Sequence, residues 1–289
     1  MAAQIIDGRK IAEKIYSELH SDIASLKKDG IIPKLTVVLV GDDPASAVYV
    51  RMKAKACEKL GIKSDTQIHP SLMTQEAILA LIDQLNADKE VHGILVQMPL
   101  PGHMNSEKVI ERISPEKDVD GFHPISKGKL QSGLDTFMPC TPYGVQKMLE
   151  YSDIEVSGKS VAIVGRSQIV GMPLALLLSQ KANNANATVT ICHSRTKNID
   201  FYTKNADIVI AALGKPEFIT ADMVSEKAVV IDVGVNRVDA PENEKGYKLV
   251  GDVKFDEVSE KVRAITPVPG GVGPMTIAML MYNTVKAAK

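Results

Sequence analysis

Short runs of aliphatic and β-branched residues alternate with longer amphipathic stretches along the chain, and this order is typical of parallel βαβ units. In the first half, the helix after the first run has clear predicted ends. Asp43 is a candidate N-cap, Pro44 suits the first helical position, and Gly61 follows the last helical residue. Strands are predicted at Leu35–Val40, Lys63–Ile68 and Gly93–Gln97.

The same order repeats after a stretch rich in Pro, Gly and Ser between residues 115 and 142. The strands predicted there are near-continuous in Val, Ile and Ala, as a parallel sheet covered on both faces requires. They are Ser160–Val164, Ala187–Cys192, Asp207–Leu213 and Ala228–Val233. A last helix is expected from about residue 274 to residue 286, packing back on the first domain.

The sequence therefore predicts an α/β fold of two domains, in agreement with about 150 residues per domain in a chain of 289. We expect an N-terminal βαβ substrate domain formed by residues 1–122 together with 274–289. A Rossmann-like domain with a parallel sheet should span residues 140–273, and residues 123–139 should form a hinge region.

Composition narrows the class of protein. Hydrophobic residues make up 45% and charged residues 24%, which are ordinary values for a globular protein. A net charge of −1, with 4% aromatic residues and no Trp, argues against nucleic acid as the main partner. The longest apolar run, Ile169–Leu178, is too short to span a bilayer, and Asp7 and Arg9 interrupt any signal sequence. We expect a cytoplasmic protein with no membrane partner.

The three cysteines are too few and too widely spaced for a disulfide framework or a structural zinc site. This pattern fits a reducing compartment and predicts no metal ion. They are Cys57, Cys140 and Cys192.

A glycine turn, Gly165–Gly171, lies between a predicted strand and a predicted helix, where a dinucleotide pyrophosphate binds in Rossmann-like folds. The pattern departs from GxGxxG, because Ser167 stands at the third position and the last glycine is one residue late. A turn that merely connects strand to helix would explain the glycines about as well. The residues that follow the next predicted strand favour a cofactor site.

The next predicted strand runs into His193, Ser194 and Arg195, where an NAD enzyme would place an acid for the ribose 2′-hydroxyl. Hydroxyl and cationic groups suit a 2′-phosphate instead, and Arg166 could approach that phosphate from the other side. The sequence thus predicts NADP. The plain alternative for Arg195 is a solvated surface charge.

Polar residues in the first half suggest a substrate site. Tyr49 and Lys53 are four residues apart and share a helix face, Gln97 ends a predicted strand, and Asp118 and Asp120 are expected beside the same rim. Such groups could read a flat heterocycle and move a proton. Because the helix also carries Arg51, Lys55 and Lys59, the alternative is that Lys53 is a solvated surface lysine.

The stretch Pro267–Pro274 has three glycines between prolines, so its backbone is expected to approach another group closely. A turn that begins a helix is the plain alternative.

Together these motifs resemble the bifunctional methylenetetrahydrofolate dehydrogenase/cyclohydrolase family over about residues 6–284. Met98 stands where the family usually has Leu, a volume-conserving change. The matching blocks are Tyr49-Val50-Arg51-Met52-Lys53, Gly93-Ile94-Leu95-Val96-Gln97-Met98-Pro99-Leu100-Pro101, Lys117-Asp118-Val119-Asp120-Gly121, Gly165-Arg166-Ser167 with Ile169-Val170-Gly171, and Pro269-Gly270-Gly271-Val272-Gly273-Pro274-Met275-Thr276.

The resemblance implies NADP-dependent oxidation of 5,10-methylenetetrahydrofolate to the 5,10-methenyl form, followed by its hydrolysis to 10-formyltetrahydrofolate in the same cleft. It implies that Lys53 is the acid/base of hydrolysis, tuned by Gln97, with Tyr49 on the folate ring face and Asp120 receiving the pterin N–H donors. It also suggests a homodimer that serves purine, methionine and histidine biosynthesis.

The residues that the resemblance assigns to each role form three sets. The catalytic set is Lys53, Tyr49, Gln97 and Asp120. The substrate set is Tyr49, Val50, Arg51, Met52, Lys53, Val96, Gln97, Met98, Asp120, Pro269, Gly270, Gly271, Val272 and Gly273. The cofactor set is Gly165, Arg166, Ser167, Ser194, Arg195 and Val235.

Two other functions fit part of the sequence. A monofunctional dehydrogenase would keep Arg166 and Asp120 but has no need of Lys53, which is present. A non-catalytic NADP-binding regulator would have no reason for three convergent polar side chains in the first domain.

Overall fold

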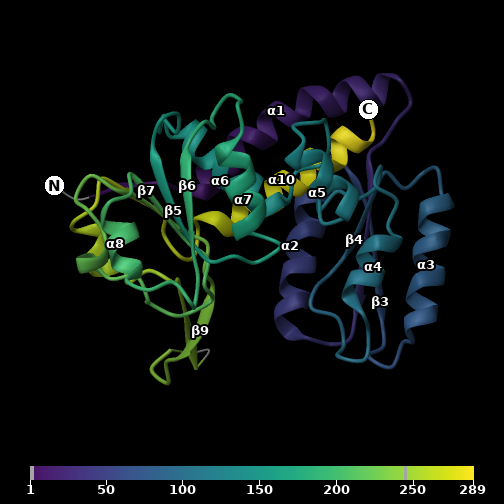
Figure 1. The fold of residues 1–289 in the computed structure, drawn as a ribbon. Helices are drawn as coiled ribbons and strands as arrows, with labels where there is room; N and C mark the ends of the chain where they lie inside the picture. The colour runs from purple at the N-terminus through teal and green to yellow at the C-terminus, as the bar shows by residue number, and fades with distance from the viewer. Residues whose placement is uncertain (1–2, 244–245) are drawn as a thin grey trace. The chain divides into compact units, whose positions relative to one another are not determined.

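The computed structural model describes residues 3–243 and 246–289, which divide into two compact units. One unit holds the chain up to Ala12 together with Thr141–Thr276, and the other holds Glu13–Cys140 together with Ile277–Lys289. Each unit has its own parallel sheet (Figure 1). The predicted α/β fold of two domains is therefore confirmed.

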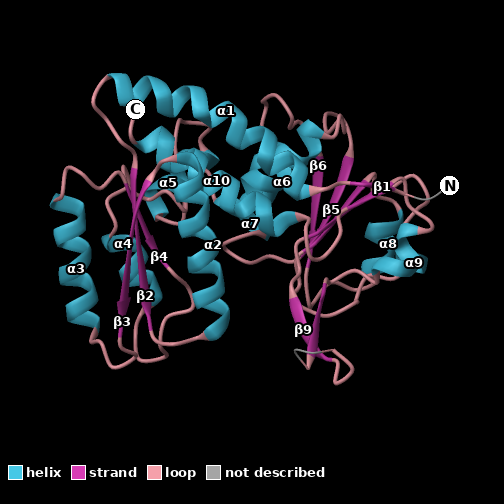
Figure 2. Cartoon of the chain, turned by 180° about the vertical axis from the view of Figure 1, so that it is seen from behind, coloured by secondary structure: helices cyan, strands magenta, loops and turns pink. Residues whose placement is uncertain are grey.

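The smaller sheet has the strand order β3-β2-β4, and helices α2 (Pro44–Leu60) and α3 (Gln75–Ala87) lie on its opposite faces (Figure 2). On the α3 side, the buried residues Ile78 and Ile82 pack with strand residues such as Ile94, and α4 (Ser106–Arg112) closes the cluster. The strands of this sheet are β2 (Lys34–Val40), β3 (Lys63–His69) and β4 (Gly93–Val96).

Helix α2 begins and ends where the sequence predicts. The Asp43 carboxylate accepts a hydrogen bond from the Ser46 amide at 2.7 Å, and Pro44 occupies the first turn. Gly61 caps the other end with a left-handed φ of 69°, a conformation that favours glycine.

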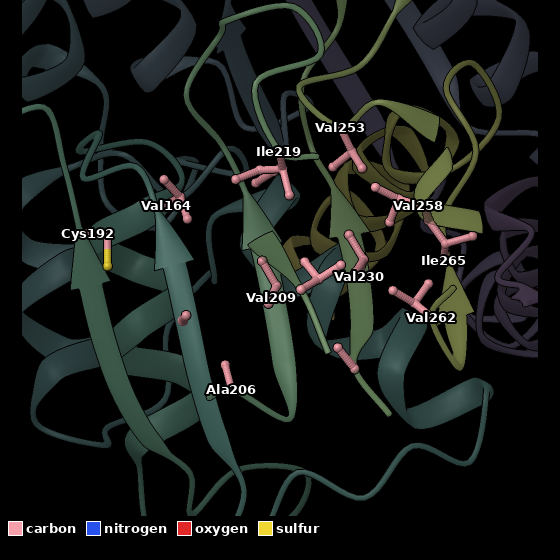
Figure 3. Packing of buried hydrophobic residues seen from close by; sticks show 14 residues of the cluster. Val164, Cys192, Ala206, Val209, Ile219, Val230, Val253, Val258, Val262 and Ile265 are labelled. Atoms are coloured by element: carbon pink, nitrogen blue, oxygen red, sulfur yellow. The ribbon is translucent and has the colours of Figure 1, made fainter. Parts of the chain in front are cut away.

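The larger sheet has the order β1-β11-β8-β7-β5-β6 with every pairing parallel. It is the doubly wound arrangement, with the strand order reversing beside β5, where such folds bind ligands. Val164, Val209 and Val230 from three adjacent strands share one hydrophobic cluster (Figure 3). The strands are β1 (Gln4–Ile5), β5 (Ser160–Val164), β6 (Thr188–Cys192), β7 (Ile208–Ala211), β8 (Val229–Asp232) and β11 (Ala264–Ile265).

Helices and one antiparallel hairpin complete this unit. The hairpin was not predicted from the sequence. The elements are α6 (Cys140–Tyr151), α7 (Gly171–Ser179), α8 (Ile199–Lys204), the 3-10 helix η1 (Ala221–Met223), α9 (Phe255–Ser259), and the hairpin strands β9 (Asn236–Asp239) and β10 (Tyr247–Val250).

The units differ from the expected boundaries at two places. The start of the chain was expected in the substrate domain, but β1 pairs with β11 and extends the larger sheet. Residues 123–139 were expected to form a hinge, but they contain helix α5 (Pro124–Gln131) and group with Glu13–Cys140. The cause is local: a Cβ at Gly121 would lie 2.6 Å from the Pro139 nitrogen, so the backbone on both sides of α5 is packed together.

Two long helices, α1 (Gly8–Lys28) and α10 (Val272–Ala287), each contribute residues to both units. The expected packing of the last helix on the first domain is confirmed. Asn283 Nδ2 donates hydrogen bonds to the Val119 and Met138 carbonyls at 2.8 and 2.9 Å. Helix α10 begins two residues earlier than predicted, so Val272 and Gly273 belong to the helix rather than to the preceding loop.

Within residues 3–243 and 246–289, no helix is long and apolar enough to cross a membrane. The same residues contain no group of three or more His, Cys, Asp or Glu side chains that could hold a metal ion.

Lys117 provides a test of what fixes α3. Its ammonium donates to the carbonyls of Leu85, Asn86 and Asp88 at the end of that helix, at 3.0, 2.9 and 2.6 Å. Lys117→Met keeps the aliphatic stem but removes all three bonds. We expect the free energy of unfolding to fall by about 1.5 to 3 kcal/mol, measured by urea denaturation. Lys108→Met on the exposed face of α4 is the control, and an equal small effect of both would contradict the capping role.

Candidate active site

The ammonium of Lys53 is buried in the smaller unit. The side chain projects from α2 and is 8% exposed. Its Nζ donates a hydrogen bond to Gln97 Oε1 at 2.9 Å, and Gln97 Nε2 donates to the Met98 carbonyl at 2.7 Å. The second bond fixes the amide so that its oxygen faces the lysine. The structure thus brings Lys53 and Gln97 together, and Lys53 is not the solvated helix lysine of the alternative interpretation.

Asp120 acts on this lysine electrostatically. Burial lowers the pKa of Lys53, and the negative charge of Asp120 and the thiol of Cys140 work in the opposite direction. Burial likewise raises the pKa of Asp120, while Lys53 lowers it. A lysine with a lowered pKa can release and regain a proton nearer to neutral pH than an exposed one.

The sequence predicts a lowered pKa for Lys53, both from the flanking charges of Arg51 and Lys55 and from its place in a partly closed cleft. The direction agrees, and of these two causes burial is the main one. Both flanking side chains are exposed, and removal of the ammonium from water is the main effect.

Asp118 was expected beside the same rim as Asp120, and it lies close enough for the charge of Asp120 to contribute to its raised pKa, but its carboxylate is used in hydrogen bonds within the fold. The Asp118 side chain is buried and accepts hydrogen bonds from the amides of Phe122 and His123 and from the Ser126 hydroxyl, at 3.2, 2.9 and 2.7 Å. Burial raises its pKa to about 6. Its carboxylate holds the turn into α5, and of the two acids of this motif only Asp120 affects the pKa of Lys53.

The remaining residues of the substrate set in this unit divide by exposure. Tyr49 and Met52 are 37% and 42% exposed on α2 and offer aromatic and apolar surface, and Arg51 is exposed as well. Val50 and Val96 are buried, so their side chains belong to the core rather than to an accessible ligand surface. Met98 packs partly against the cluster on the α3 side of the sheet.

The glycine turn in the larger unit meets the steric demands of a dinucleotide site. Gly165 has a φ of 138°, and a Cβ there would collide with the Ala212 carbonyl oxygen. A Cβ at Gly171 would collide with the Gly165 carbonyl oxygen. The two glycines therefore allow the tight turn and the close packing of α7 that the pyrophosphate motif requires. The Ser167 hydroxyl accepts from the amides of Val170 and Gly171 at 3.1 and 3.4 Å and caps the start of α7.

The candidate 2′-phosphate residues follow two paired strands. Val164 of β5 pairs with Cys192 of β6, and Arg166 and Ser194 each lie two residues beyond that pair. Arg166, Ser194 and Arg195 are all exposed. No acid stands among the three residues that follow β6, so the donor set suits a phosphate rather than a ribose hydroxyl. Val235 is exposed just beyond β8.

The glycine-rich loop before α10 is held tightly within its own unit. A Cβ at Gly271 would lie 2.6 Å from the Pro267 carbonyl oxygen, and one at Gly8 would collide with the Gly271 carbonyl oxygen. The close approach expected of this backbone is therefore at least partly to the start of α1. Val272 is buried, which leaves Pro269 as the most accessible residue of the loop.

Two features of the site escaped the sequence analysis. Cys140 was considered only for its redox meaning, yet its thiol lies close enough to affect the pKa of Lys53. Asp232 and Asp252 were not considered at all, although both are buried near the carboxyl ends of the larger sheet. In the sequence both stand among apolar residues, which indicates that they are buried. A buried carboxylate needs hydrogen-bond donors nearby, and these cannot be identified from the sequence.

Both halves of the chain match known protein domains. Residues 6–120 match the family model for the tetrahydrofolate dehydrogenase/cyclohydrolase catalytic domain, and residues 139–289 match its NAD(P)-binding domain. The chain is 56% identical to bifunctional protein FolD 2 of Geobacter sulfurreducens, over 99% of this chain and 97% of that protein. It is 54% identical to bifunctional protein FolD of Bacillus subtilis, over 100% and 99%.

Solved structures show the same similarity. The methylenetetrahydrofolate dehydrogenase/cyclohydrolase FolD of Campylobacter jejuni is 51% identical with a TM-score of 0.93, covering 99% of both chains. The Trypanosoma brucei enzyme, solved with NADP cofactor and an inhibitor, is 38% identical with a TM-score of 0.93, covering 99% of this chain and 97% of that one.

The coupling between Asp120 and Lys53 can be measured directly. Asp120→Asn removes the negative charge that favours the ammonium, so the pKa of Lys53 should fall further. The measurement is an NMR titration of the lysine side-chain carbon next to Nζ, with Lys53 assigned by its absence in Lys53→Met. Asp83→Asn, which removes an exposed carboxylate paired with Arg112, is the control. A Lys53 pKa that stays constant in Asp120→Asn would contradict the coupling.

Proposed function

Because this chain belongs to the tetrahydrofolate dehydrogenase/cyclohydrolase family, we propose that it oxidises 5,10-methylenetetrahydrofolate with NADP⁺ and then hydrolyses the 5,10-methenyl product to 10-formyltetrahydrofolate. The chain is a bifunctional enzyme of this family, with both domains present over nearly its whole length. The observation that best supports the second activity is the buried Lys53 ammonium held by Gln97 beside Asp120.

In the oxidation step, NADP⁺ would act as the hydride acceptor. The chain binds and orients the two reactants. The Gly165–Gly171 turn and the start of α7 offer a close-approaching backbone for the pyrophosphate. Arg166, Ser194 and Arg195 would hold the 2′-phosphate. No protein base is needed for hydride transfer, so the positioning of the two reactants is the chain's contribution.

In the hydrolysis step, water adds to the methenyl carbon and one carbon–nitrogen bond of the ring breaks. The water oxygen becomes the formyl oxygen and so loses both of its protons. One proton ends on the departing ring nitrogen, and the other is released to solvent, because the methenyl reactant is a cation. Lys53 can accept the first proton as an amine and return it as an ammonium, which its burial and lowered pKa favour. Gln97 fixes the position of Nζ during this exchange.

Asp120 and Tyr49 have roles in folate recognition in this proposal. The Asp120 carboxylate can accept two N–H donors of the pterin ring, a bidentate geometry that also sets the ring orientation. Tyr49 is exposed one helical turn from Lys53 and can cover a ring face. Pro269, Gly270 and Gly273 remain candidates for a wall of the folate site.

The alternatives account for less of the structure. A monofunctional dehydrogenase has no use for a buried lysine that is held by a glutamine and coupled to a carboxylate. A non-catalytic NADP-binding protein has no use for the smaller unit's polar cluster at all.

The wider setting rests on family membership alone. It includes a folate-binding role for the smaller unit, a homodimer, a cytoplasmic location, and supply of one-carbon units for purine, methionine and histidine biosynthesis. Light scattering coupled to size-exclusion chromatography tests the dimer directly, and a monomeric mass would contradict it.

Replacement of Lys53 separates the two activities. Lys53→Met keeps the length and apolar packing of the stem but deletes the ammonium. Cyclohydrolase activity should fall by about 10²- to 10⁴-fold, the usual contribution of a positioned acid/base, while much of the dehydrogenase activity persists. Methenyltetrahydrofolate should then accumulate, as followed by its absorbance.

Lys55→Met, on the exposed side of the same helix, is the control and should retain both rates. The wild-type cyclohydrolase rate should also rise with pH as Lys53 loses its proton, with a midpoint below the ordinary range of a lysine because burial lowers this pKa. If both activities fall together in folded Lys53→Met, Lys53 positions the substrate instead.

Arg166 tests the cofactor assignment. Charge-assisted hydrogen bonds contribute about 1.5 to 3 kcal/mol, so Arg166→Ala should weaken NADP⁺ binding by about 10- to 150-fold. NAD⁺ lacks the 2′-phosphate and should bind almost as before. Calorimetric titration of both cofactors provides the measurement, with Lys181→Ala as an exposed-cation control. Equal losses for NAD⁺ and NADP⁺ would remove the 2′-phosphate assignment.

A further inference from the structure

The carboxylate of Asp252 has an unusual set of partners for a side chain that is 0% exposed. It accepts hydrogen bonds from the successive amides of Leu213, Gly214 and Lys215, at 2.6, 2.9 and 2.9 Å. A fourth bond comes from Asn236 Nδ2 at 2.9 Å. A carboxylate has about four acceptor positions, so these donors fill it. Successive amides that converge in this way form an anion-binding nest, here occupied by the chain's own acid.

The loop that supplies the three amides borders the place where the cofactor turn lies. It follows β7, which pairs with β5, at the side of β5 where the order of the doubly wound sheet reverses. Gly165 begins the cofactor turn, and its missing Cβ leaves room for the carbonyl of Ala212, the residue just before this loop. A shift of the loop would therefore disturb the turn directly.

The fourth donor links a second loop. Asn236 begins β9 and immediately follows Val235, the exposed residue assigned to the cofactor beyond β8. One carboxylate thus fixes the segments that follow β7 and β8, two neighbouring strands. Both segments lie at the carboxyl edge of the sheet, where ligands bind.

Asp232, at the end of β8, holds Asp252 in turn. Its carboxylate accepts from the amides of Gly234, Asp252 and Val253, at 3.0, 2.9 and 2.9 Å. Two glycines provide the space, because a Cβ at Gly251 would collide with the Asp232 carboxylate and one at Gly234 with the Asp252 carboxylate. Two adjacent buried acids are costly unless they are hydrogen-bonded, and here all of these bonds except that from the Asn236 side chain come from backbone amides.

We propose that Asp252 is a positioning residue for dinucleotide binding, whose buried carboxylate holds the loops after β7 and β8 in the shape that accepts the cofactor. It does not touch the cofactor in this proposal. Its role rests on the proposed function only in that the bound ligand is NADP(H). Hydrolysis of the methenyl compound depends on Lys53 in the other unit and needs no dinucleotide, so that activity is independent of Asp252.

Asp252→Asn is the sharpest variant. It preserves shape, but the amide nitrogen turns a donor toward groups that are themselves donors, so at least one loop amide loses its acceptor. We expect the dissociation constant for NADPH, measured by calorimetry on the full chain, to rise by at least about 10-fold. NADH binding should weaken by a similar factor, because the loops after β7 and β8 are distinct from the 2′-phosphate residues.

The rates distinguish positioning from general damage. The KM for NADP⁺ should rise while cyclohydrolase activity, assayed on supplied methenyltetrahydrofolate without dinucleotide, stays within about twofold of wild type. Asp256→Asn, an exposed acid on α9, is the matched control and should change neither quantity. Unchanged NADPH binding in folded Asp252→Asn overturns the proposal. An equal loss of cyclohydrolase activity also overturns it, since that result shows a purely structural role.

A second variant covers the case in which Asp252→Asn does not fold. Asn236→Ala leaves the three amide bonds to the carboxylate and removes only the link to the second loop. We expect about a 3- to 10-fold loss of NADPH affinity with normal cyclohydrolase activity, and no loss overturns the proposal. A wild-type chain that binds NADPH but catalyses neither reaction would refute the proposed function. The ratio of the variant's dissociation constant for NADPH to that of the wild type would still decide the role of Asp252.

Discussion

The chemistry proposed for the smaller unit depends on keeping one ammonium group out of water. Lys53 extends from a helix whose other lysines are exposed, and the difference is made by packing rather than by residue type. A buried ammonium without partners would lose its proton outright, and one in a tight ion pair would hold it firmly. A neutral amide acceptor at 2.9 Å and a carboxylate acting electrostatically lie between these extremes. This intermediate environment is what a group that must both accept and donate a proton requires.

The rest of the smaller unit serves to hold that environment in place. Asp118 and Lys117 lie in the same short segment as Asp120, yet both make structural hydrogen bonds, one to the start of α5 and the other to the end of α3. Asn283, on the last helix, donates a hydrogen bond to the carbonyl of Val119. Asp120 is thus the one acid of this segment left to act on Lys53, because its neighbours fix the backbone on either side of it.

Local signals predicted much of this architecture. Asp43, Pro44 and Gly61 determine the ends of α2 through their own backbone preferences, and runs of Val and Ile identify the buried parallel strands with small errors at their ends. What sequence could not predict depends on partners far away in the chain. Strand β1 is two residues long and exists through its pairing with β11, some 260 residues later, so no local pattern reveals that it extends the larger sheet.

The candidate site shows the same division. Sequence motifs predicted Lys53, Gln97 and Asp120 as site residues. Spacing alone put Asp118 and Asp120 at the same rim, and only the family resemblance singled out Asp120. They also predicted a lowered pKa for Lys53 from charged neighbours and a partly closed cleft together. Because Arg51 and Lys55 are exposed, burial is the main cause. Periodicity and spacing indicate which residues are near a site. The hydrogen-bond donors around each carboxylate determine which of them are free to act in it.

Each unit contains buried acids, and they differ in how many hydrogen-bond donors surround the carboxylate. In the larger unit, the donors around Asp252 are sufficient to fill its acceptor positions, so the acid becomes part of the scaffold. In the smaller unit, Asp120 retains a coupling to Lys53 and partial exposure, so it can still accept donors from a ligand. The number of backbone amides that converge on a carboxylate therefore separates acids that shape a site from acids that meet a substrate. By this criterion Asp118, Asp232 and Asp252 belong to the first group, and Asp120 is the acid proposed to meet the substrate.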